Sequence, residues 1–305
     1  MKPKLLIDTD PGVDDALALM MAVNADIFDI VAITTLCGNS TVENSMRNAR
    51  YILNSIGKSE VSLYQGASNP LVRPLRQAVV HGEDGLLGMN KLGSIVSDGD
   101  AVDTILKMVG WYPDEVTIIA LGPLTNIATA IQRAPAVMSR VQNIIIMGGA
   151  INVVGNMSNG AEFNFFVDPE AAKIVCEFPI AKILIPLDVC NQAIVTLADL
   201  NRLRGDKNGA LLRRLIEPYI ENIYNETGVD GAIMYDPLAV YYAINREAFK
   251  VEEVKVSIGT REGNRGVISV KGAKSDGLSI MAATAFSSGF DFADAFVEVM
   301  DDSSL

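Results

Sequence analysis

The feature that most constrains the fold is an alternation of short apolar runs with segments of helical periodicity. Each run is rich in Val, Ile and Leu and ends close to a Gly, a Pro or a polar residue. Such runs are typical of strands buried on both faces, which crossover helices connect in parallel sheets. The predicted strands are Leu5–Ile7, Ile30–Leu36, Val61–Tyr64, Val116–Leu121, Val141–Met147 and Ala181–Ile185.

The remaining segments complete the predicted architecture. The predicted helices are Asp14–Asn24, Thr41–Ile56, one that begins at Thr125, and Thr196–Asn225 outside the sheet. Val254–Ile258 and Gly266–Val270, separated by a charged turn with Gly, predict a small antiparallel hairpin. Gly66–Gly99 has little periodicity and predicts a long loop. We therefore predict an α/β fold, with residues 1–305 as a single domain and a mostly parallel, Rossmann-like open sheet covered by helices.

Composition limits the classes of function. The chain has 305 residues, 49% of them hydrophobic, and a mean hydropathy of +0.26, so a sizeable core is expected. No apolar run approaches the ~18 residues that cross a bilayer, and no charged-then-apolar leader precedes the first strand, so we expect a cytoplasmic protein without a membrane partner. The net charge is −12 and Lys and Arg are dispersed, which disfavours nucleic acid as a partner.

Cysteine and histidine are too sparse for several common kinds of site. The three cysteines, Cys37, Cys176 and Cys190, form no CxxC pair, so neither a disulfide framework nor a zinc site is indicated. His81 is the one histidine of the chain. A Ser-His-Asp centre or a multi-histidine metal site would have to use it alone, so carboxylate chemistry is favoured.

Four carboxylates stand within eight positions where the first strand passes into the first helix. Asp8, Asp10, Asp14 and Asp15 would repel one another, and a folded protein compensates such crowding with a cation or shared protons. Capping of the helix N-terminus explains Asp14 or Asp15, but not the two acids before the turn at Pro11. A metal or sugar site at this strand end is therefore favoured.

Polar residues also follow other predicted strands, and the carboxyl ends of parallel strands face one way. Asn39 follows the second strand, Leu121 ends the fourth, and Asp236 precedes a helical run. Asn156, Glu162 and Asn164 follow the fifth strand. Oxygen ligands without His or Cys suit Ca²⁺ or Mg²⁺, and several amides and carboxylates suit a sugar. Each residue alone is explained by capping or exposure, but together they predict a site.

Asp8–Ala16 resembles the N-terminal fingerprint of the inosine-uridine nucleoside hydrolases. The similarity continues in order through Gly38-Asn39, His81–Leu86, Leu121–Asn126, Met147–Gly149, Gly155-Asn156, Ala161–Asn164, Asp168–Ala172 and Asp236-Pro237. The resemblance covers most of the chain. It implies hydrolysis of the N-glycosidic bond of ribonucleosides to free base and ribose, in nucleoside salvage, by a Ca²⁺-dependent homo-oligomer (dimer or tetramer).

The resemblance also implies roles for individual residues. It implies a Ca²⁺ site made by Asp10, Asp15, the carbonyl oxygen of Leu121 and Asp236, with Asp10 taking a proton from the attacking water. The residues that it implies for the ribose are Asp14 and Asn39 on the 2′ side, Asn156, Glu162 and Asn164 on the 5′ and 3′ hydroxyls, Met147 against the sugar, and Asp236.

The sequence departs from the family pattern before the late Asp-Pro pair. Many members carry a histidine there that protonates the departing base, whereas this chain has Tyr235. An unperturbed tyrosine pKa of ~10 makes a poor acid near neutrality. The family places the loop of His81 near the base, so we predict His81 and Tyr235 as the catalytic candidates there. Tyr219 and Tyr224 either stack over the base or pack within a helix.

Two other interpretations stay open at this point. The first is a nucleoside- or ribose-binding relative that lost turnover together with the histidine, although such a binder has less need of Asp10. The second is a phosphotransferase of the haloacid dehalogenase type, which also opens with Asp-x-Asp after its first strand, as Asp8 and Asp10 do. That class needs a later Lys and a further acidic pair, and the sequence does not clearly contain them. Purine or pyrimidine preference also stays open.

Overall fold

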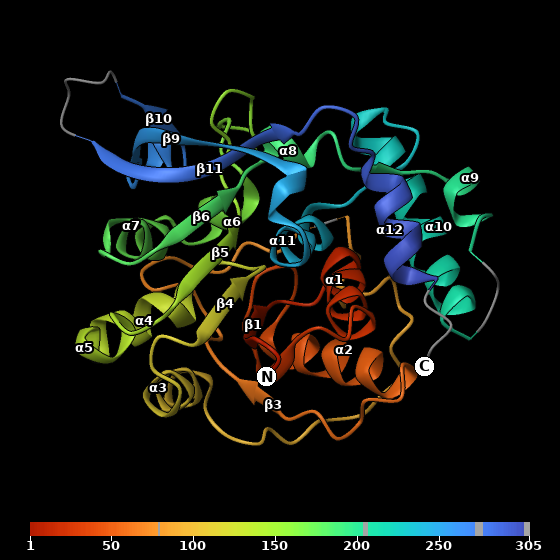
Figure 1. Ribbon diagram of the computed structural model, residues 1–305, viewed down its shortest axis with the longest axis horizontal. Coiled ribbons are helices and arrows are strands. Elements are labelled where there is room, and N and C mark those ends of the chain that lie inside the picture. The colour runs from red at the N-terminus through yellow and green to blue at the C-terminus, as the bar shows by residue number, and fades with distance from the viewer. Residues whose placement is uncertain (79, 204–206, 272–276, 302–305) are drawn as a thin grey trace.

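Figure 1 shows the computed structural model of the chain, which describes residues 1–78, 80–203, 207–271 and 277–301. The elements follow one another as β1 (Lys4–Thr9), α1 (Val13–Asn24), β2 (Asp29–Thr35), α2 (Val42–Ser55), β3 (Leu63–Gln65), α3 (Ala101–Trp111), β4 (Val116–Ala120), α4 (Thr125–Arg133), α5 (Pro135–Met138), β5 (Asn143–Met147), α6 (Phe163–Val167), α7 (Pro169–Glu177), β6 (Lys182–Ile185), α8 (Leu187–Cys190), β7 (Ile194–Val195), α9 (Leu197–Leu200), α10 (Lys207–Thr227), β8 (Ala232–Ile233), α11 (Tyr235–Ile244), η1 (Arg246–Ala248), β9 (Phe249–Ile258), η2 (Glu262–Asn264), β10 (Ile268–Val270), β11 (Leu278–Phe286) and α12 (Phe292–Met300).

Nine strands of the described chain form one sheet in the order β10-β9-β11-β6-β5-β4-β1-β2-β3. Strands β1 to β6 pair in parallel, and β11 pairs in parallel with β6, whereas β9 and β10 are antiparallel. The order 3-2-1-4-5-6 is that of doubly wound α/β folds, and its direction reverses between β1 and β4. Ligands bind beyond the carboxyl ends of the strands at such a reversal.

Helices cover both faces of this sheet (Figure 1). Successive side chains of a strand point to opposite faces, so Leu6 and Ile144 belong to one apolar cluster and Ile7 and Ile145 to the other. The first cluster includes side chains of α3, α4 and α7, and the second includes those of α1, α2, α11 and α12. Because both faces are buried, the central strands are apolar throughout, as the sequence indicated.

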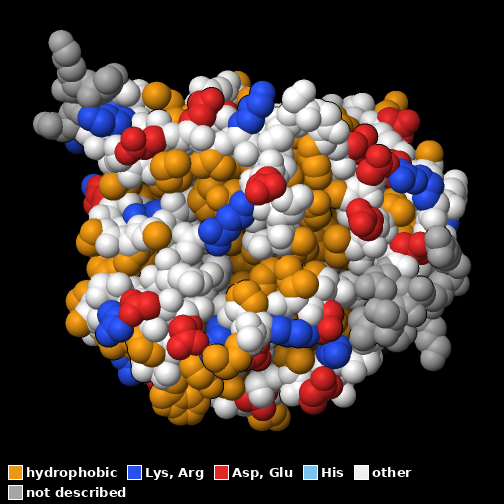
Figure 2. All heavy atoms as spheres, viewed as in Figure 1, with side chains coloured by type: hydrophobic (Ala, Val, Ile, Leu, Met, Phe, Trp, Pro, Cys, Tyr) orange, Lys and Arg blue, Asp and Glu red, His pale blue; other side chains and the backbone are white. Residues whose placement is uncertain are grey.

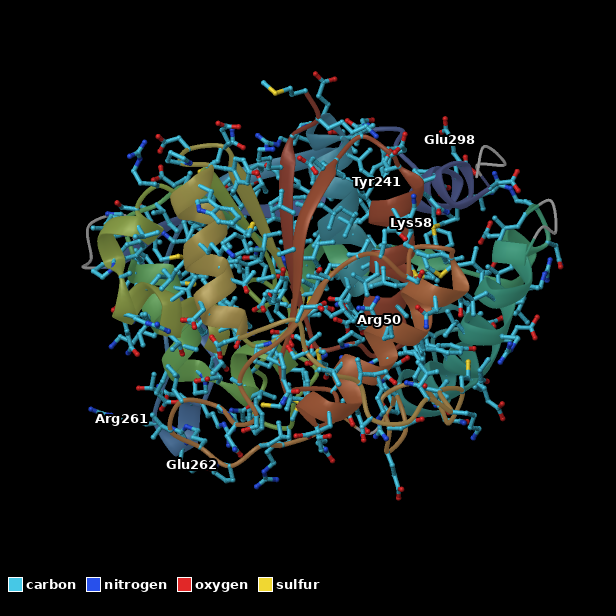
Figure 3. The ribbon with its side chains drawn as sticks, turned by 90° about the horizontal axis from the view of Figure 1, so that it is seen from below. Arg50, Lys58, Tyr241, Arg261, Glu262 and Glu298 are labelled. Carbon is cyan, nitrogen blue, oxygen red and sulfur yellow. The ribbon has the colours of Figure 1, made fainter. Side chains whose placement is uncertain are left out.

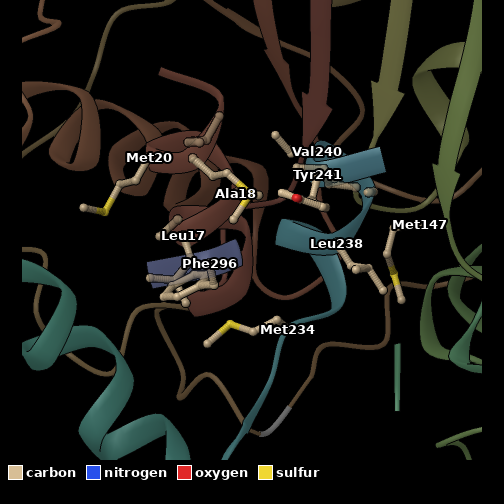
Figure 4. Close-up of a cluster of buried hydrophobic side chains, with 14 of the residues drawn as sticks. Leu17, Ala18, Met20, Met147, Met234, Leu238, Val240, Tyr241 and Phe296 are labelled. Carbon is tan, nitrogen blue, oxygen red and sulfur yellow. The ribbon is translucent and has the colours of Figure 1, made fainter. Parts of the chain in front are cut away.

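Helix α1 lies at the centre of the larger cluster, and all of its residues are buried. It packs against α11, and Figure 4 shows Leu17 of α1, Leu238 of α11 and Phe296 of α12 in this cluster. The first turn of α1 carries Asp14, and the first turn of α11 carries Asp236. The packing of two apolar helices therefore contributes to bringing these two acids together.

The predicted fold class is confirmed, with several local differences. Strand β3 begins two residues later than the predicted Val61. The predicted hairpin is confirmed as β9 and β10, but β11 joins it to the main sheet. The Ala-rich sequence of β11 has low strand propensity, so it was not predicted. The predicted helix Thr196–Asn225 is α9 and most of α10, and its residues 204–206 lie outside the described residues.

The predicted loop Gly66–Gly99 contains no helix or strand in its described residues. None of the described helices is both long and apolar enough to span a membrane. Figure 2 shows Lys and Arg side chains scattered among Asp and Glu over one face of the molecule.

Replacement of Ile145 by Ala should lower the free energy of unfolding by about 2–5 kcal/mol, because Ile145 is fully buried on a central strand and the smaller side chain leaves a cavity. Urea unfolding followed by circular dichroism measures this. Ile27→Ala is the matched control, because Ile27 is 42% exposed, and it should change little. Equal losses in both variants would contradict the described core.

Candidate active site

A cavity of about 520 Å³ lies where the strand order reverses, beyond the ends of β1, β4 and β5. Most residues predicted for the site line it, namely Asp14, Asn39, His81, Leu121, Met147, Asn156, Glu162, Asn164, Tyr235 and Asp236. Asp10 and Asp15 do not line it, but both are buried and hydrogen-bonded to Asn39, which does. The structure therefore gathers the predicted residues from distant segments into one region.

Asp15 holds the turn between β1 and α1. Its Oδ1 accepts hydrogen bonds from the Thr9 hydroxyl and from the backbone N–H of Asp10 (3.2 Å). Its Oδ2 accepts from the backbone N–H of Gly12 (2.9 Å) and from Nδ2 of Asn39 (3.0 Å). These bonds fix the path of the chain that carries the other acids and tie it to the segment after β2.

Asp10 lies between two glycines that leave room for its carboxylate. A Cβ at Gly38 would lie 2.0 Å from Oδ2, and a Cβ at Gly122 would lie 2.3 Å from Oδ1. Oδ2 accepts a hydrogen bond from the backbone N–H of Asn39 (2.6 Å), whereas Oδ1 is buried and has no partner among the described residues. One oxygen of Asp10 is thus held in place and the other is left available.

Asp14, Asp15 and Asp236 each place a carboxylate oxygen within 4.8 Å of the others. Burial, followed by the charge of Asp15, raises the pKa of Asp10 and of Asp14 well above the usual range. Burial, followed by the charge of Asp14, does the same for Asp236. Oδ1 of Asp14 also has no hydrogen-bond partner in the described chain. Buried, mutually repelling carboxylates with unpartnered oxygens fit a divalent cation.

This trio differs from the predicted ligand set. It includes Asp14, which was predicted to bind the ribose, and omits Asp10, whose Oδ2 is engaged by Asn39. Leu121 lines the cavity, and its carbonyl oxygen accepts a hydrogen bond from Nδ2 of Asn164 (2.7 Å). The set of Asp10, Asp15, Leu121 and Asp236 stays a prediction.

Glu162 and Asn164 lie at the start of the short helix α6. Glu162 caps this helix, since its carboxylate accepts from the backbone N–H groups of Asn164 (2.7 Å) and Phe165 (3.1 Å), and it also accepts from Gly149 (2.9 Å). Nδ2 of Asn164 donates to the carbonyl oxygens of Leu121 (2.7 Å) and Met147 (3.2 Å). These bonds attach α6 to the ends of β4 and β5.

His81 lies on the loop before α3 and contacts the first turn of α1. Its Nδ1 accepts a hydrogen bond from the backbone N–H of Val13 (3.2 Å), and its Nε2 is 3.6 Å from Oδ1 of Asp14. Burial lowers the pKa of His81 to about 4, against an opposing effect of Asp15. The ring is therefore neutral near pH 7, and because Nδ1 is an acceptor the proton lies on Nε2.

Tyr219 of α10 stacks on His81 with ring centroids 5.5 Å apart and an interplanar angle of 19°. Tyr219 is fully buried and lines the cavity, and its hydroxyl has no partner in the described chain. Tyr224 is 56% exposed and does not line the cavity. Tyr235 lines it, and burial raises the pKa of its hydroxyl. Of the two tyrosines Tyr219 and Tyr224 of α10, Tyr219 is thus the one that lies at the site.

The sequence did not point to several other residues that line the cavity. They are Gln77, Ala78 and Val80 before His81, Met157 and Phe163 around Glu162, and Ile223, Glu226 and Thr227 of α10. Helical spacing was a usable signal for α10, because Tyr219, Ile223, Glu226 and Thr227 share one face of a helix. The loop residues carry no comparable periodicity.

The fold and the site define a doubly wound α/β protein with an acidic ligand site at its strand-order reversal. Residues 5–288 match the model of the inosine-uridine preferring nucleoside hydrolase family, so the chain belongs to this family and is a hydrolase acting on nucleosides. The resemblance inferred from the motifs is confirmed. The phosphotransferase interpretation is set aside, because the match to this family extends over most of the chain.

Relatives support this assignment. The chain is 35% identical over 266 residues to a probable uridine nucleosidase 1 of Oryza sativa subsp. japonica, covering 85% of this chain and 82% of the relative. It is 34% identical over 263 residues to the pyrimidine-specific ribonucleoside hydrolase RihA of Salmonella arizonae, covering 84% of each. Its fold matches a purine-preferring ribonucleoside hydrolase from Gardnerella vaginalis with a TM-score of 0.89, 27% identity and 98% of each chain covered.

Addition of a divalent cation should raise the unfolding temperature of the wild type, because the ion neutralises the buried acids. At a free concentration ~100 times the Kd the stabilisation amounts to about 2.7 kcal/mol. Asp236→Asn should be at least as stable as the wild type in chelator, because one repelling charge is gone, and should gain little from the ion. Thermal unfolding with EDTA and with added CaCl₂ measures both effects. Asp114→Asn, on the exposed Asp114–Arg140 pair, is the control and should respond like the wild type. An equal response of Asp236→Asn would contradict the assignment.

Proposed function

We propose that the protein hydrolyses the N-glycosidic bond of ribonucleosides to free base and ribose, with Ca²⁺ as its cofactor and a role in nucleoside salvage. One observation carries this proposal: a single cavity is lined by buried acids and amides and also by the rings of His81, Tyr219 and Tyr235. The first set suits a polyhydroxylated sugar beside a cation, and the second suits a flat, weakly polar base.

The ribose end accounts for stabilisation of the transition state. Cleavage passes through an oxocarbenium-like ribosyl cation, which nearby carboxylates and oxygen dipoles stabilise. We assign the 2′ side to Asp14 and Asn39, and the 3′ and 5′ hydroxyls to Asn156, Glu162 and Asn164, with Met147 against the sugar. All but Asn156 are buried, so a substrate that lacks a hydroxyl would leave a buried group unpaired.

Asp10, Asp15, the carbonyl oxygen of Leu121 and Asp236 are the proposed ligands of the cation, and Asp14 is close enough to share it. When bound, Ca²⁺ supplies positive charge that orients a water molecule and lowers its pKa. Oδ1 of Asp10 is the proposed acceptor of the proton from the attacking water, because it is the oxygen without a partner. Asn39 keeps Oδ2 in place and so orients this acceptor.

The base end supplies hydrogen bonds to the leaving group. His81 offers the proton on Nε2, and Tyr235 offers a hydroxyl whose raised pKa keeps it protonated near neutrality. A tyrosine of this kind donates a hydrogen bond rather than a whole proton. Purines need protonation at N7 to leave, so this donor set favours pyrimidine ribonucleosides. The pyrimidine names of the two curated relatives support the same preference.

The second candidate function is binding of a nucleoside or ribose without turnover. Tyr235 in place of the usual histidine favours it, whereas the unpartnered oxygen of Asp10 has no use in a simple binder. We also propose that residues 1–305 act as one domain in a cytoplasmic homo-oligomer, a dimer or tetramer, which light scattering of the purified protein tests.

Incubation with uridine, cytidine, inosine and adenosine, followed by a reducing-sugar assay, tests the proposed function. We expect release of ribose from uridine and cytidine first, loss of activity in EGTA, and recovery with CaCl₂. 2′-Deoxyuridine should react at least ~10-fold more slowly, since an unpaired buried group costs about 1–3 kcal/mol. No ribose from any nucleoside would refute hydrolysis, and tight uridine binding in calorimetry without ribose would establish the binding function instead.

His81→Ala should lower kcat for uridine by roughly tenfold or more, because the hydrogen bond from the neutral imidazole to the leaving base is lost and a buried acceptor left unpaired costs about 1–3 kcal/mol. Tyr235→Phe also removes one hydrogen-bond donor and should lower kcat by a similar factor. Steady-state kinetics with uridine and inosine measure both variants. Tyr224→Phe is the control and should keep wild-type rates, because Tyr224 lies away from the cavity. A His81→Ala enzyme with wild-type kcat would exclude His81 from leaving-group activation.

A further inference from the structure

Arg265, just before β10, does not line the cavity but reaches the helix that carries Asn164. It is 4% exposed. Its Nε donates to the carbonyl oxygen of Phe166 (2.6 Å), and its Nη2 donates to that of Val167 (3.1 Å). The guanidinium also lies over the ring of Phe166, with Cζ 4.2 Å from the centroid. Arg265 therefore contacts the C-terminal end of α6 through three separate interactions.

These carbonyl groups need an outside partner. The last carbonyls of a helix have no partner within it and carry partial negative charge, and α6 has five residues, too few to be stable alone. The carboxylate of Glu162 caps the N-terminus of α6, and the cation of Arg265 caps its C-terminus. Both ends of the helix are thus held by opposite charges.

The turn that bears Arg265 fits closely against α6. Gly266 has φ +71°, and a Cβ there would lie 2.6 Å from the carbonyl carbon and oxygen of Phe165. Nδ2 of Asn159 donates to the carbonyl oxygen of Arg265 (2.7 Å), while its Oδ1 accepts from the N–H of Ala161 (3.1 Å). The turn therefore also holds the chain that leads into Glu162.

This turn is itself anchored. Figure 3 labels Arg261 and Glu262 on it at the periphery of the molecule. Arg73 forms ion pairs with Glu262 (2.9 Å) and with Glu170 of α7 (2.9 Å), so the turn is attached to two further segments. Glu262 and Glu170 act on Arg265 through their charges, while its Nε and Nη2 donate to backbone carbonyl oxygens. A buried cation is costly, and an apolar side chain of similar size would avoid that cost. Packing alone therefore does not require an arginine here.

We propose that Arg265 is a positioning residue, which fixes the orientation of Glu162 and Asn164 from the far end of α6 and thereby sets the affinity for the ribose. The inference rests on the proposed function of the cavity. Without the guanidinium, the carbonyl oxygens in the last turn of α6 lose their hydrogen-bond donor and the helix loosens. Asn164 then holds its bonds to the Leu121 and Met147 carbonyls less firmly, and Glu162 no longer faces the sugar in one orientation.

Steady-state kinetics of Arg265→Met and Arg265→Lys test this proposal. We expect the KM for uridine and the inhibition constant of ribose to rise together by roughly tenfold in Arg265→Met, with kcat falling less. Arg265→Lys keeps the charge and should recover part of the affinity. The unfolding-temperature shift on adding CaCl₂ should change much less than KM, since the carboxylates proposed for the cation lie in α1, in the turn before it and in α11, and none of them lies in α6. Arg140→Met, on an exposed ion pair, is the control with wild-type constants.

Amide hydrogen exchange of residues 163–168 gives a second readout that needs no activity. Exchange should be faster in Arg265→Met than in the wild type, and unchanged in Arg140→Met. If the wild type releases no ribose, the proposed function is refuted. Faster exchange in Arg265→Met would then still support the positioning role of Arg265. Unchanged exchange together with an unchanged KM in folded Arg265→Met would overturn the inference. A fall in kcat and in the CaCl₂-induced shift of the unfolding temperature as large as the rise in KM would also overturn it. If Arg265→Met does not fold, Asn159→Asp is the second variant, because it removes the donor to the carbonyl oxygen of Arg265. Asn159→Asp should also raise the KM for uridine. A wild-type KM in Asn159→Asp would overturn the inference.

Discussion

Buried negative charge at one edge of the sheet is the constraint on which the rest of the structure depends. Asp10, Asp14, Asp15 and Asp236 are almost fully buried, and burial together with mutual repulsion raises the pKa values of Asp10, Asp14 and Asp236. Backbone N–H groups and Asn39 offset part of this cost, and so do the positive ends of α1 and α11. The remaining charge is what a divalent cation would neutralise, so the electrostatic cost of the fold and the affinity for a cation have one origin.

The hydrophobic core determines where these charges meet. Helices α1 and α11 are far apart in the sequence, and both are apolar on nearly all sides, which is typical of helices buried within a protein. Their contact aligns the turn that carries Asp14 and Asp15 with the turn that carries Asp236. Because packing sets this alignment, a cavity in the contact between α1 and α11 would displace the acids without touching them.

The strand-end residues were predictable because a parallel sheet places the carboxyl ends of its strands at one edge. Asn39 and Glu162 could be assigned to the site from that rule alone. The place of Tyr219 could not, because it depends on how α10 crosses the sheet edge, which helical periodicity does not specify. The proposed role of Arg265 also could not be predicted from the sequence, because Arg265 contacts a backbone carbonyl 99 positions away and belongs to no recognisable motif. The Ala-rich strand β11 was missed because tertiary pairing overrides its weak propensity.

The lining of the cavity comes from two kinds of element. The acids and amides come from the ends of strands and from helix N-termini that the sheet fixes, whereas α10 and the loop before α3 contribute Tyr219 and His81. The two sets are in contact, because Nε2 of His81 lies 3.6 Å from Oδ1 of Asp14 and its Nδ1 accepts a hydrogen bond from the backbone N–H of Val13. Tyr235 and Asp236 are neighbours in the first turn of α11, so one helix contributes to both sets. Under the proposed function, His81 and Tyr235 share the hydrogen bonds to the leaving base, and Tyr219 stacks on the ring of His81 and so limits how that ring can turn.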